Sequence, residues 1–161
     1  MHNDNLNKSL NILRKIYSDN LSVTLIAEDL VSCSLEDDTK IIKSKMDELD
    51  FDYFGVESGG KLIGYVVKNE LGEQSIAEYI RYFAMEDLVS EATSLIELLQ
   101  ILKEKHPVFI LEKNQVRKLI TVADLQKQPI RMLVFGLISL LEMELVRLIQ
   151  NSFPGKNGKP V

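Results

Sequence analysis

The sequence contains one cysteine, Cys33, among its 161 residues, and it contains no tryptophan. A single cysteine can form neither an internal disulfide nor a cysteine-based zinc site, so we expect a reducing compartment and a cytoplasmic location. We expect Cys33 itself to be a small residue of the core. There are only two histidines, and no HExxH motif, nucleophile elbow or glycine-rich phosphate loop occurs. These absences predict a protein that is not an enzyme, holds no metal and requires no cofactor.

Long apolar runs and an excess of positive charge are also missing. The longest apolar stretch, residues 132–141, is interrupted by Gly136 and Ser139, whereas a membrane-spanning helix needs roughly 20 apolar residues. The polar residues 1–9 lack the apolar segment of a secretory signal. With a formal net charge of -5, the chain lacks the broad positive field that attracts nucleic acids. We therefore expect a soluble protein with neither a membrane nor a nucleic acid as partner.

A short unit is used twice along the chain. The pentapeptide Glu-Asp-Leu-Val-Ser at residues 28–32 recurs at residues 86–90. Each copy is followed by a helical pattern, a strand, a turn, a second strand and an acidic residue before leucine. These patterns lie at residues 39–49, 53–56, 57–60, 62–67 and 70–71, and again at residues 95–102, 108–111, 112–115, 116–121 and 124–125. We predict an α/β (α+β) fold with two β-α-β-β-α repeats, residues 22–72 and 73–128, around a shared core.

Apolar residues at helical spacing flank the two repeats. In residues 1–21 they predict an amphipathic helix that carries Leu6, Leu10, Leu13, Ile16 and Tyr17. Residues 129–152 predict a second helix, which starts at Pro129, and residues 153–161 form a tail that we expect to be flexible. The second helix is too apolar to stand alone in water. It packs on the first helix, builds a homodimer interface or docks an unknown partner protein.

One string of residues suggests ligand chemistry. The second strand of the second copy ends at Thr121, and Asp124 follows three residues later at the start of a helical segment. A carboxylate can accept two hydrogen bonds from a ribose diol, and a hydroxyl near a helix N-terminus can meet a phosphate. The alternative is that Thr121 or Asp124 only caps the helix. His106, which precedes Pro107, is a further candidate for ligand contact.

The ordered duplication and the string Ile-Thr-Val-Ala-Asp-Leu at residues 120–125 resemble the CBS domain, which is named after cystathionine β-synthase. Two such domains in tandem resemble a Bateman module. The first copy keeps the glycine of the pattern at Gly64 but has Val67 and Glu70 where the hydroxyl and the aspartate belong. The second copy has Lys118 in place of the glycine. The resemblance implies two repeats related by a pseudo-twofold axis, with clefts between their sheets.

Members of this family commonly bind adenine-containing ligands, so the resemblance implies AMP, ADP, ATP or S-adenosylmethionine as a ligand. Carried over to this chain, Asp124 would hold the ribose and Thr121 a phosphate or ribose oxygen, while Arg117 and Lys118 would add positive charge. The slot for adenine would consist of Leu88, Val89, Ser90 and Val108. Because Val67 cannot donate a hydrogen bond, we predict one site, in a regulatory protein that signals to a partner. The alternative is an interaction protein that kept the fold, lost the ligand and acts through its C-terminal helix.

Overall fold

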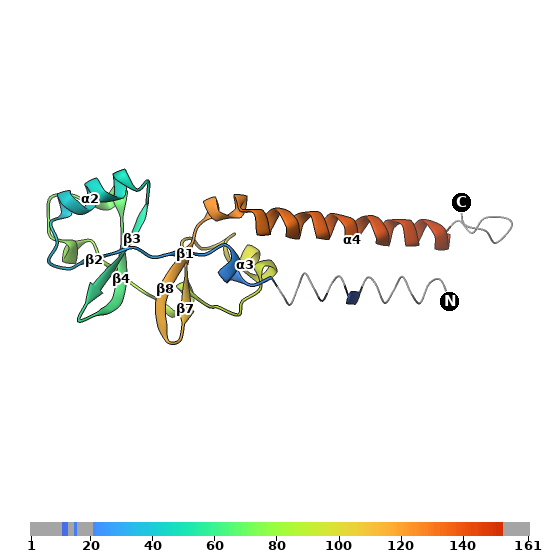
Figure 1. Cartoon of the computed structure of the whole chain (residues 1–161), viewed down its shortest axis with the longest axis horizontal. Coiled ribbons are helices and arrows are strands. Elements are labelled where there is room, and N and C mark those ends of the chain that lie inside the picture. The colour runs from blue at the N-terminus through green and yellow to red at the C-terminus, as the bar shows by residue number, and fades with distance from the viewer. Residues whose placement is uncertain (1–10, 13–14, 16–20, 153–161) are drawn as a thin grey trace.

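The computed structural model describes residues 11–12, 15 and 21–152 (Figure 1). The apolar residues of the predicted N-terminal helix, which are Leu6, Leu10, Leu13, Ile16 and Tyr17, lie outside the described residues, as does the tail at 153–161. Within the described ranges, no helix combines the length and the apolar character that crossing a membrane requires.

Two four-stranded sheets form the centre of the molecule (Figure 1). One has the order β2-β3-β4-β5, with strands Ser32–Ser34, Tyr53–Ser58, Lys61–Val67 and Arg81–Tyr82. The other has the order β1-β8-β7-β6, with strands Glu28–Asp29, Gln115–Ile120, Val108–Glu112 and Leu88–Ser90. Each sheet has one parallel pair, β2 with β3 or β6 with β7, and its other pairs are antiparallel. This shared arrangement confirms the duplicated unit.

The outermost antiparallel strand of each sheet comes from the other repeat. Strand β1 is the first strand of the first repeat, yet Glu28 pairs with Leu119 in the sheet of the second repeat. Strand β5 is the first strand of the second repeat, yet Tyr82 pairs with Gly64 in the first sheet. The two repeats therefore exchange their first strands.

The two copies of the pentapeptide do not occupy equivalent places. Residues 28 and 29 form β1, whereas residues 86 and 87 belong to the 3-10 helix η4 (Met85–Asp87). The pairing with the central strands instead makes Cys33 equivalent to Val89, since these residues lie opposite Val56 and Ile110. The duplication is therefore present, but the structural alignment of the two copies is shifted by two residues from the alignment of the identical pentapeptides.

Side-chain caps define where the first two helices begin. The Asp38 carboxylate accepts hydrogen bonds from the backbone N–H groups of Lys40 and Ile41, at 2.8 and 3.3 Å, before α2 (Thr39–Glu48). The Ser94 hydroxyl accepts one from the Glu97 N–H, at 3.2 Å, before α3 (Leu95–Ile101). Such caps satisfy N–H groups that have no partner within the helix.

The second helix predicted for the first repeat is wrong in detail. In its place are two single 3-10 turns, η2 (Lys68–Glu70) and η3 (Ile76–Glu78). Between them lies Leu-Gly-Glu-Gln-Ser, in which glycine and serine disfavour a helix interior. In the second repeat, the 3-10 helix η5 (Val122–Gln126) leads into the long helix α4 (Gln128–Ser152), which confirms the predicted C-terminal helix.

Apolar residues pack in three clusters. One lies under α2 in the first repeat, and one joins α3, the start of α4 and the second sheet. The third, which we call the inter-sheet cluster, holds the two sheets together through Leu30, Tyr65, Phe109, Val116 and Leu119. The Phe109 ring is 4.7 Å from the Tyr65 ring and 4.8 Å from the Phe83 ring, measured between centroids. The two repeats therefore share a core, as the sequence predicts.

Cys33 lies in the cluster under α2, and burial raises the pKa of its thiol to about 11. At pH 8 the thiol therefore stays protonated, and the thiolate is the reactive form. We expect iodoacetamide to alkylate Cys33 in the folded protein at least about 100-fold more slowly than in the urea-unfolded chain. Mass spectrometry over a time course measures both rates. Equal rates would contradict the buried position of Cys33.

Candidate functional site

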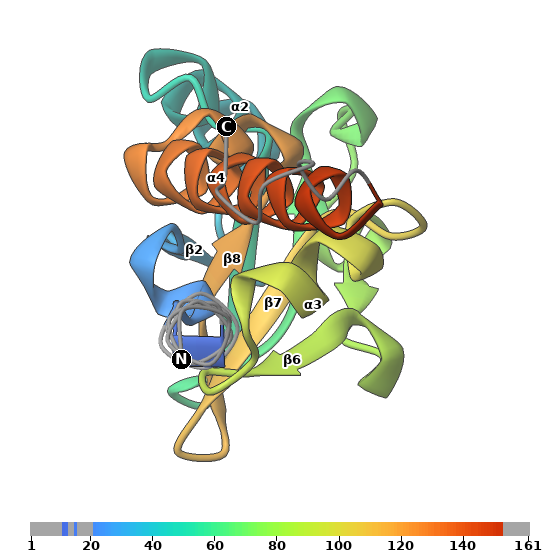
Figure 2. The same ribbon diagram turned by 90° about the vertical axis from the view of Figure 1, so that its right-hand side faces the viewer.

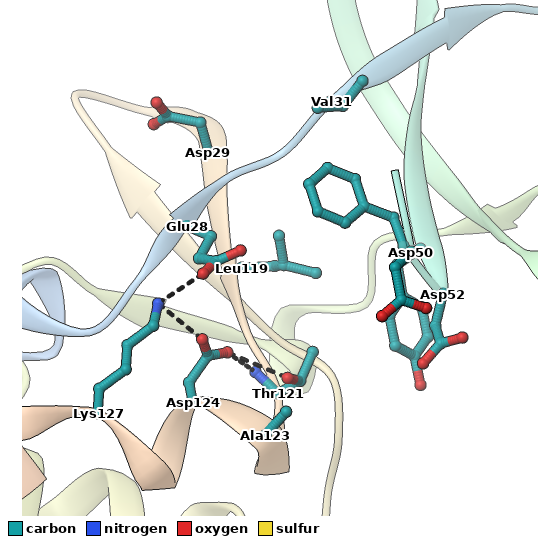
Figure 3. Close-up of a pocket in the computed structure, with 12 residues that line it drawn as sticks. Glu28, Asp29, Val31, Asp50, Asp52, Leu119, Thr121, Ala123, Asp124 and Lys127 are labelled. Atoms are coloured by element: carbon teal, nitrogen blue, oxygen red, sulfur yellow. Dashed lines mark hydrogen bonds and ion pairs between the residues drawn. The ribbon is translucent and has the colours of Figure 1, made fainter. Parts of the chain in front are cut away.

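A cavity of about 270 Å³ opens where the two repeats meet (Figure 3). We call it the Asp124 cleft. The first repeat contributes β1 and the loop after α2, and the second contributes the end of β8 and η5. The lining residues are Glu28, Asp29, Val31, Asp50, Phe51, Asp52, Tyr53, Leu119, Thr121, Ala123, Asp124 and Lys127. Its volume is slightly below the range of about 300–1,000 Å³ that is typical of small-molecule sites.

Thr121 and Asp124 lie together in this cleft, and both belong to the predicted site. One carboxylate oxygen of Asp124, Oδ2, accepts hydrogen bonds from the Thr121 backbone N–H at 2.7 Å and from its hydroxyl at 3.1 Å. Asp124 is only 6% exposed, which is unusual for an aspartate unless its oxygens have partners. Asp124 thus caps η5, and the same carboxylate forms part of the cleft wall.

Lys127 occupies the other carboxylate oxygen. Its ammonium nitrogen is 2.8 Å from Asp124 Oδ1 and 2.8 Å from Glu28 Oε1 (Figure 3). It also donates a hydrogen bond to the Ile26 carbonyl oxygen at 2.6 Å. These three contacts match the three protons of an ammonium group. Burial alone would lower the pKa of Lys127, but its hydrogen bonds with Asp124 and Glu28 raise it above the usual value. Lys127 therefore connects η5 to the beginning of the first repeat.

The lining of the cleft is acidic. Five of its residues carry a carboxylate, and Lys127 is its single base. Two further lysines lie near the rim carboxylates, since Lys118 is 3.8 Å from Asp29 and Lys68 is 3.8 Å from Asp52. Even so, a negative lining concentrates cations and repels anions. In the described part of the chain, however, no three or more His, Cys, Asp or Glu side chains are arranged to hold a metal ion.

The remaining predicted site residues lie elsewhere. Leu88, Val89 and Ser90 line a separate hollow beside Met85, and Val108 is buried in the core of the second repeat. Lys118 and Arg117 belong to β8, but neither lines the Asp124 cleft, and His106 is exposed and does not line it either. The structure thus brings Thr121 and Asp124 together but does not bring the predicted adenine slot to them.

Sequence reasoning missed the half of the cleft that the first repeat supplies. Asp50, Phe51 and Tyr53 follow α2, and Glu28 lies in β1. Phe51 and Tyr53 provide aromatic surface beside the acidic groups. The pseudo-symmetry of the two repeats could have predicted this contribution, because a cleft between two sheets is lined by residues of both repeats.

The equivalent position in the first repeat is filled from within the chain. Glu70, which corresponds to Asp124, forms an ion pair with the guanidinium of Arg81 from β5. A Cβ atom at Gly64 would collide with the Arg81 carbonyl oxygen, so glycine is needed where this strand approaches. Lys118, the equivalent of Gly64, lies opposite Asp29 instead. The two copies therefore differ in their acidic residue and in the basic residue that pairs with it, which is Arg81 for Glu70 and Lys127 for Asp124.

Comparisons with known proteins show which fold this is. No family model matches the sequence, and no curated protein matches it. A solved domain of unknown function from Neisseria meningitidis MC58 matches with a TM-score of 0.58 and 18% identity, over 75% of this chain and 98% of that chain.

Two further solved structures carry informative descriptions. The CBS domain of a bacterial CNNM/CorC family Mg²⁺ transporter matches with a TM-score of 0.54 and 13% identity, over 74% of this chain and 80% of that chain. A CBS domain pair in complex with 5′-methylthioadenosine and S-adenosyl-L-methionine matches with a TM-score of 0.54 and 11% identity, over 65% of this chain and 95% of that chain. At these identities the matches bear on the fold.

Proposed function

Since this chain has the fold of a tandem CBS domain pair, we propose that it is a regulatory protein that binds one adenosine-type small molecule in the Asp124 cleft and signals its occupancy to a partner. One observation carries the proposal. The Thr121 hydroxyl and the Asp124 carboxylate lie in contact in a cleft between the two sheets. The solved CBS domain pair that holds methylthioadenosine and S-adenosylmethionine supports this class of ligand.

A ribose diol suits the chemistry of Asp124. Asp124 Oδ1 accepts a hydrogen bond from the Lys127 ammonium at 2.8 Å. The two hydroxyls of a ribose can donate to the same carboxylate if Lys127 moves aside, and hydrogen bonds to a charged acceptor are among the stronger ones. Phe51 and Tyr53 offer aromatic surface against which an adenine ring can pack.

The negative charge of the cleft lining favours neutral or cationic ligands over anionic ones. Because the cleft residues include five carboxylates and one lysine, a phosphate group would enter an unfavourable field. A neutral adenosine compound avoids this penalty, and the sulfonium and ammonium groups of S-adenosylmethionine gain from it. Of the ligands that the family resemblance implies, we therefore favour S-adenosylmethionine over AMP, ADP and ATP.

The contacts of Lys127 suggest how occupancy is signalled. Lys127 binds Glu28 and the Ile26 carbonyl on one side, and Gln128, the first residue of α4, directly follows it. A ligand that replaces Lys127 as the hydrogen-bond partner of Asp124 would free Lys127 from η5. The position of Lys127, and with it the start of α4, would then be held less firmly. A ligand shifts the balance between two arrangements of the repeats and α4 only if it binds one of them more tightly than the other. Competition with Lys127 for Asp124 would provide that difference in affinity.

Titration calorimetry on the full chain tests the proposal. We expect S-adenosylmethionine or methylthioadenosine to bind with a stoichiometry near one per chain, and to bind at least about tenfold more tightly than ATP. A bound ligand must also raise the melting temperature at saturating dose. A stoichiometry near two would contradict the single site, and tighter binding of ATP would contradict the role of the acidic lining.

One observation favours a second function: both carboxylate oxygens of Asp124 have partners within the chain, Thr121 and Lys127. The buried acid of the cleft therefore needs no ligand to be satisfied. If none of the adenosine compounds changes the melting temperature, the alternative of a ligand-free interaction protein is favoured. That protein would act through α4, whose outer surface is apolar.

A further inference from the structure

Helix α4 extends well beyond the two sheets (Figure 1). Its 25 residues correspond to a length of about 37 Å. Ile130, Leu133, Gly136 and Leu140 are buried along one side of its first half. Figure 2, which turns this end of the molecule toward the viewer, shows α4 lying in front of the sheets. Much of the helix therefore has surface available for a further contact.

The opposite side of α4 is apolar and exposed. Phe135 has 72% of its surface exposed, and nine other large apolar residues are also classed as exposed, namely Met132, Val134, Leu137, Ile138, Leu141, Leu145, Val146, Leu148 and Ile149. Scattered exposed apolar residues are ordinary, but a continuous patch of this size is typical of an interaction surface.

One packing helix is too narrow to cover this patch. At 3.6 residues per turn, the ten exposed positions span an arc of about 220° around the axis of α4. The apolar stripe of a helix that packs on one neighbour is about 100° wide. A helix formed by residues 6–17 of the same chain would therefore cover part of the patch and leave the rest in water.

One strip within the patch has the spacing of a two-helix seam. Val134, Ile138, Leu141, Leu145 and Leu148 follow one another at alternating intervals of four and three residues. This heptad pattern places apolar side chains along one line of a helix, where they interlock with the same line on a second helix. All five residues are uncharged. We call them the α4 seam.

The charges of α4 permit two copies to approach each other. The helix carries two arginines, Arg131 and Arg147, and two glutamates, Glu142 and Glu144, so its formal charge is balanced. The whole chain has a formal net charge of -5, which disfavours contact through most other surfaces. We propose that a second copy of this chain docks on the α4 seam to form a symmetric homodimer, in which the same patch serves both subunits.

Light scattering coupled to gel filtration tests this proposal on the full chain without ligand, so the result does not depend on the proposed ligand site. At micromolar concentration, we expect light scattering to give the parent protein a molar mass of twice the 18.3 kDa of one chain. The double variant Ile138→Glu/Leu145→Glu places four carboxylates in the dimer seam and is expected to elute as a monomer. Because both positions are exposed, the variant should keep the circular dichroism spectrum of the parent.

Matched controls separate the seam from a general effect of added charge. Ile41→Glu adds a carboxylate at an exposed apolar position on α2, and this variant is expected to stay dimeric. The milder pair Ile138→Ala/Leu145→Ala should raise the dimer dissociation constant at least about tenfold without adding charge. A monomeric parent overturns the proposal, as does a dimer that survives the double glutamate variant or dissociates in the Ile41→Glu variant.

Discussion

Replacing Asp124 with asparagine is expected to weaken the binding of S-adenosylmethionine or methylthioadenosine by roughly 10- to 100-fold, because a hydrogen bond to a charged group contributes about 1.5–3 kcal/mol. Asparagine keeps the size of the side chain and one acceptor oxygen, so the substitution removes charge rather than volume. Asp124 is nearly buried in the wall of the cleft, where water screens its charge little. Titration calorimetry on parent and variant measures the change.

The first repeat supplies the matched control for this experiment. Glu70→Gln makes the same chemical change at the equivalent position, where Arg81 already occupies the carboxylate. We expect this variant to bind the ligand with nearly the affinity of the parent. Because Asp124 also caps η5, its loss costs about 1 kcal/mol of stability, and a thermal melt must show that the variant remains folded at the assay temperature. Equal losses of affinity in the two variants would refute the assignment to the Asp124 cleft.

Replacing Phe109 with alanine is expected to lower the free energy of unfolding by about 3–5 kcal/mol. The Phe109 side chain is fully buried in the inter-sheet cluster, between the rings of Tyr65 and Phe83. Removing the ring deletes its transfer free energy and leaves a cavity between the two repeats. Because native domains are stable by only about 5–15 kcal/mol, this loss is a large part of the total.

Urea unfolding measured by circular dichroism tests the prediction for Phe109. Met85→Ala is a suitable control, because the Met85 side chain is 92% exposed and its removal should change stability by no more than about 0.5 kcal/mol. If Phe109→Ala unfolds at the same urea concentration as Met85→Ala, the two sheets do not depend on a shared core.

The local elements could be predicted because their signals are short-range. The apolar residues of α2 recur at helical spacing, and strands β3, β4 and β7 are rich in apolar residues. The turns fell where the chain needs a left-handed backbone, at Gly59 and Gly60 in the first hairpin and at Lys113 and Asn114 in the second. Each of these features is decided by a few neighbouring residues.

The pairing of β1 and β5 could not be predicted. Each strand has only two residues, too few to show any alternation, and each pairs with a strand far away in sequence. The identical pentapeptides also suggested a register that is two residues away from the true one, because sequence identity over five residues carries no information about pairing partners.

Two of the residues that line the candidate site were predicted from the sequence, and the others were not. Thr121 and Asp124 could be identified because they lie close together in the chain. The carboxylates opposite them, Asp50 and Asp52, come from another repeat and have no recognisable motif. Only the folded arrangement of the two sheets shows that these groups share one cleft, and their charge is the reason why we propose S-adenosylmethionine rather than a nucleotide as the ligand.

The exchange of β1 and β5 has a consequence for how this protein can be divided. A single repeat carries the segment that completes its neighbour but lacks the one that completes itself. If the chain were cut between the repeats, β4 would lose its partner β5 and β8 would lose its partner β1. Each half would then expose unpaired backbone groups along a long strand, which promotes pairing with another chain. The smallest self-sufficient piece is therefore the interlocked pair, and the repeats cannot unfold independently of each other.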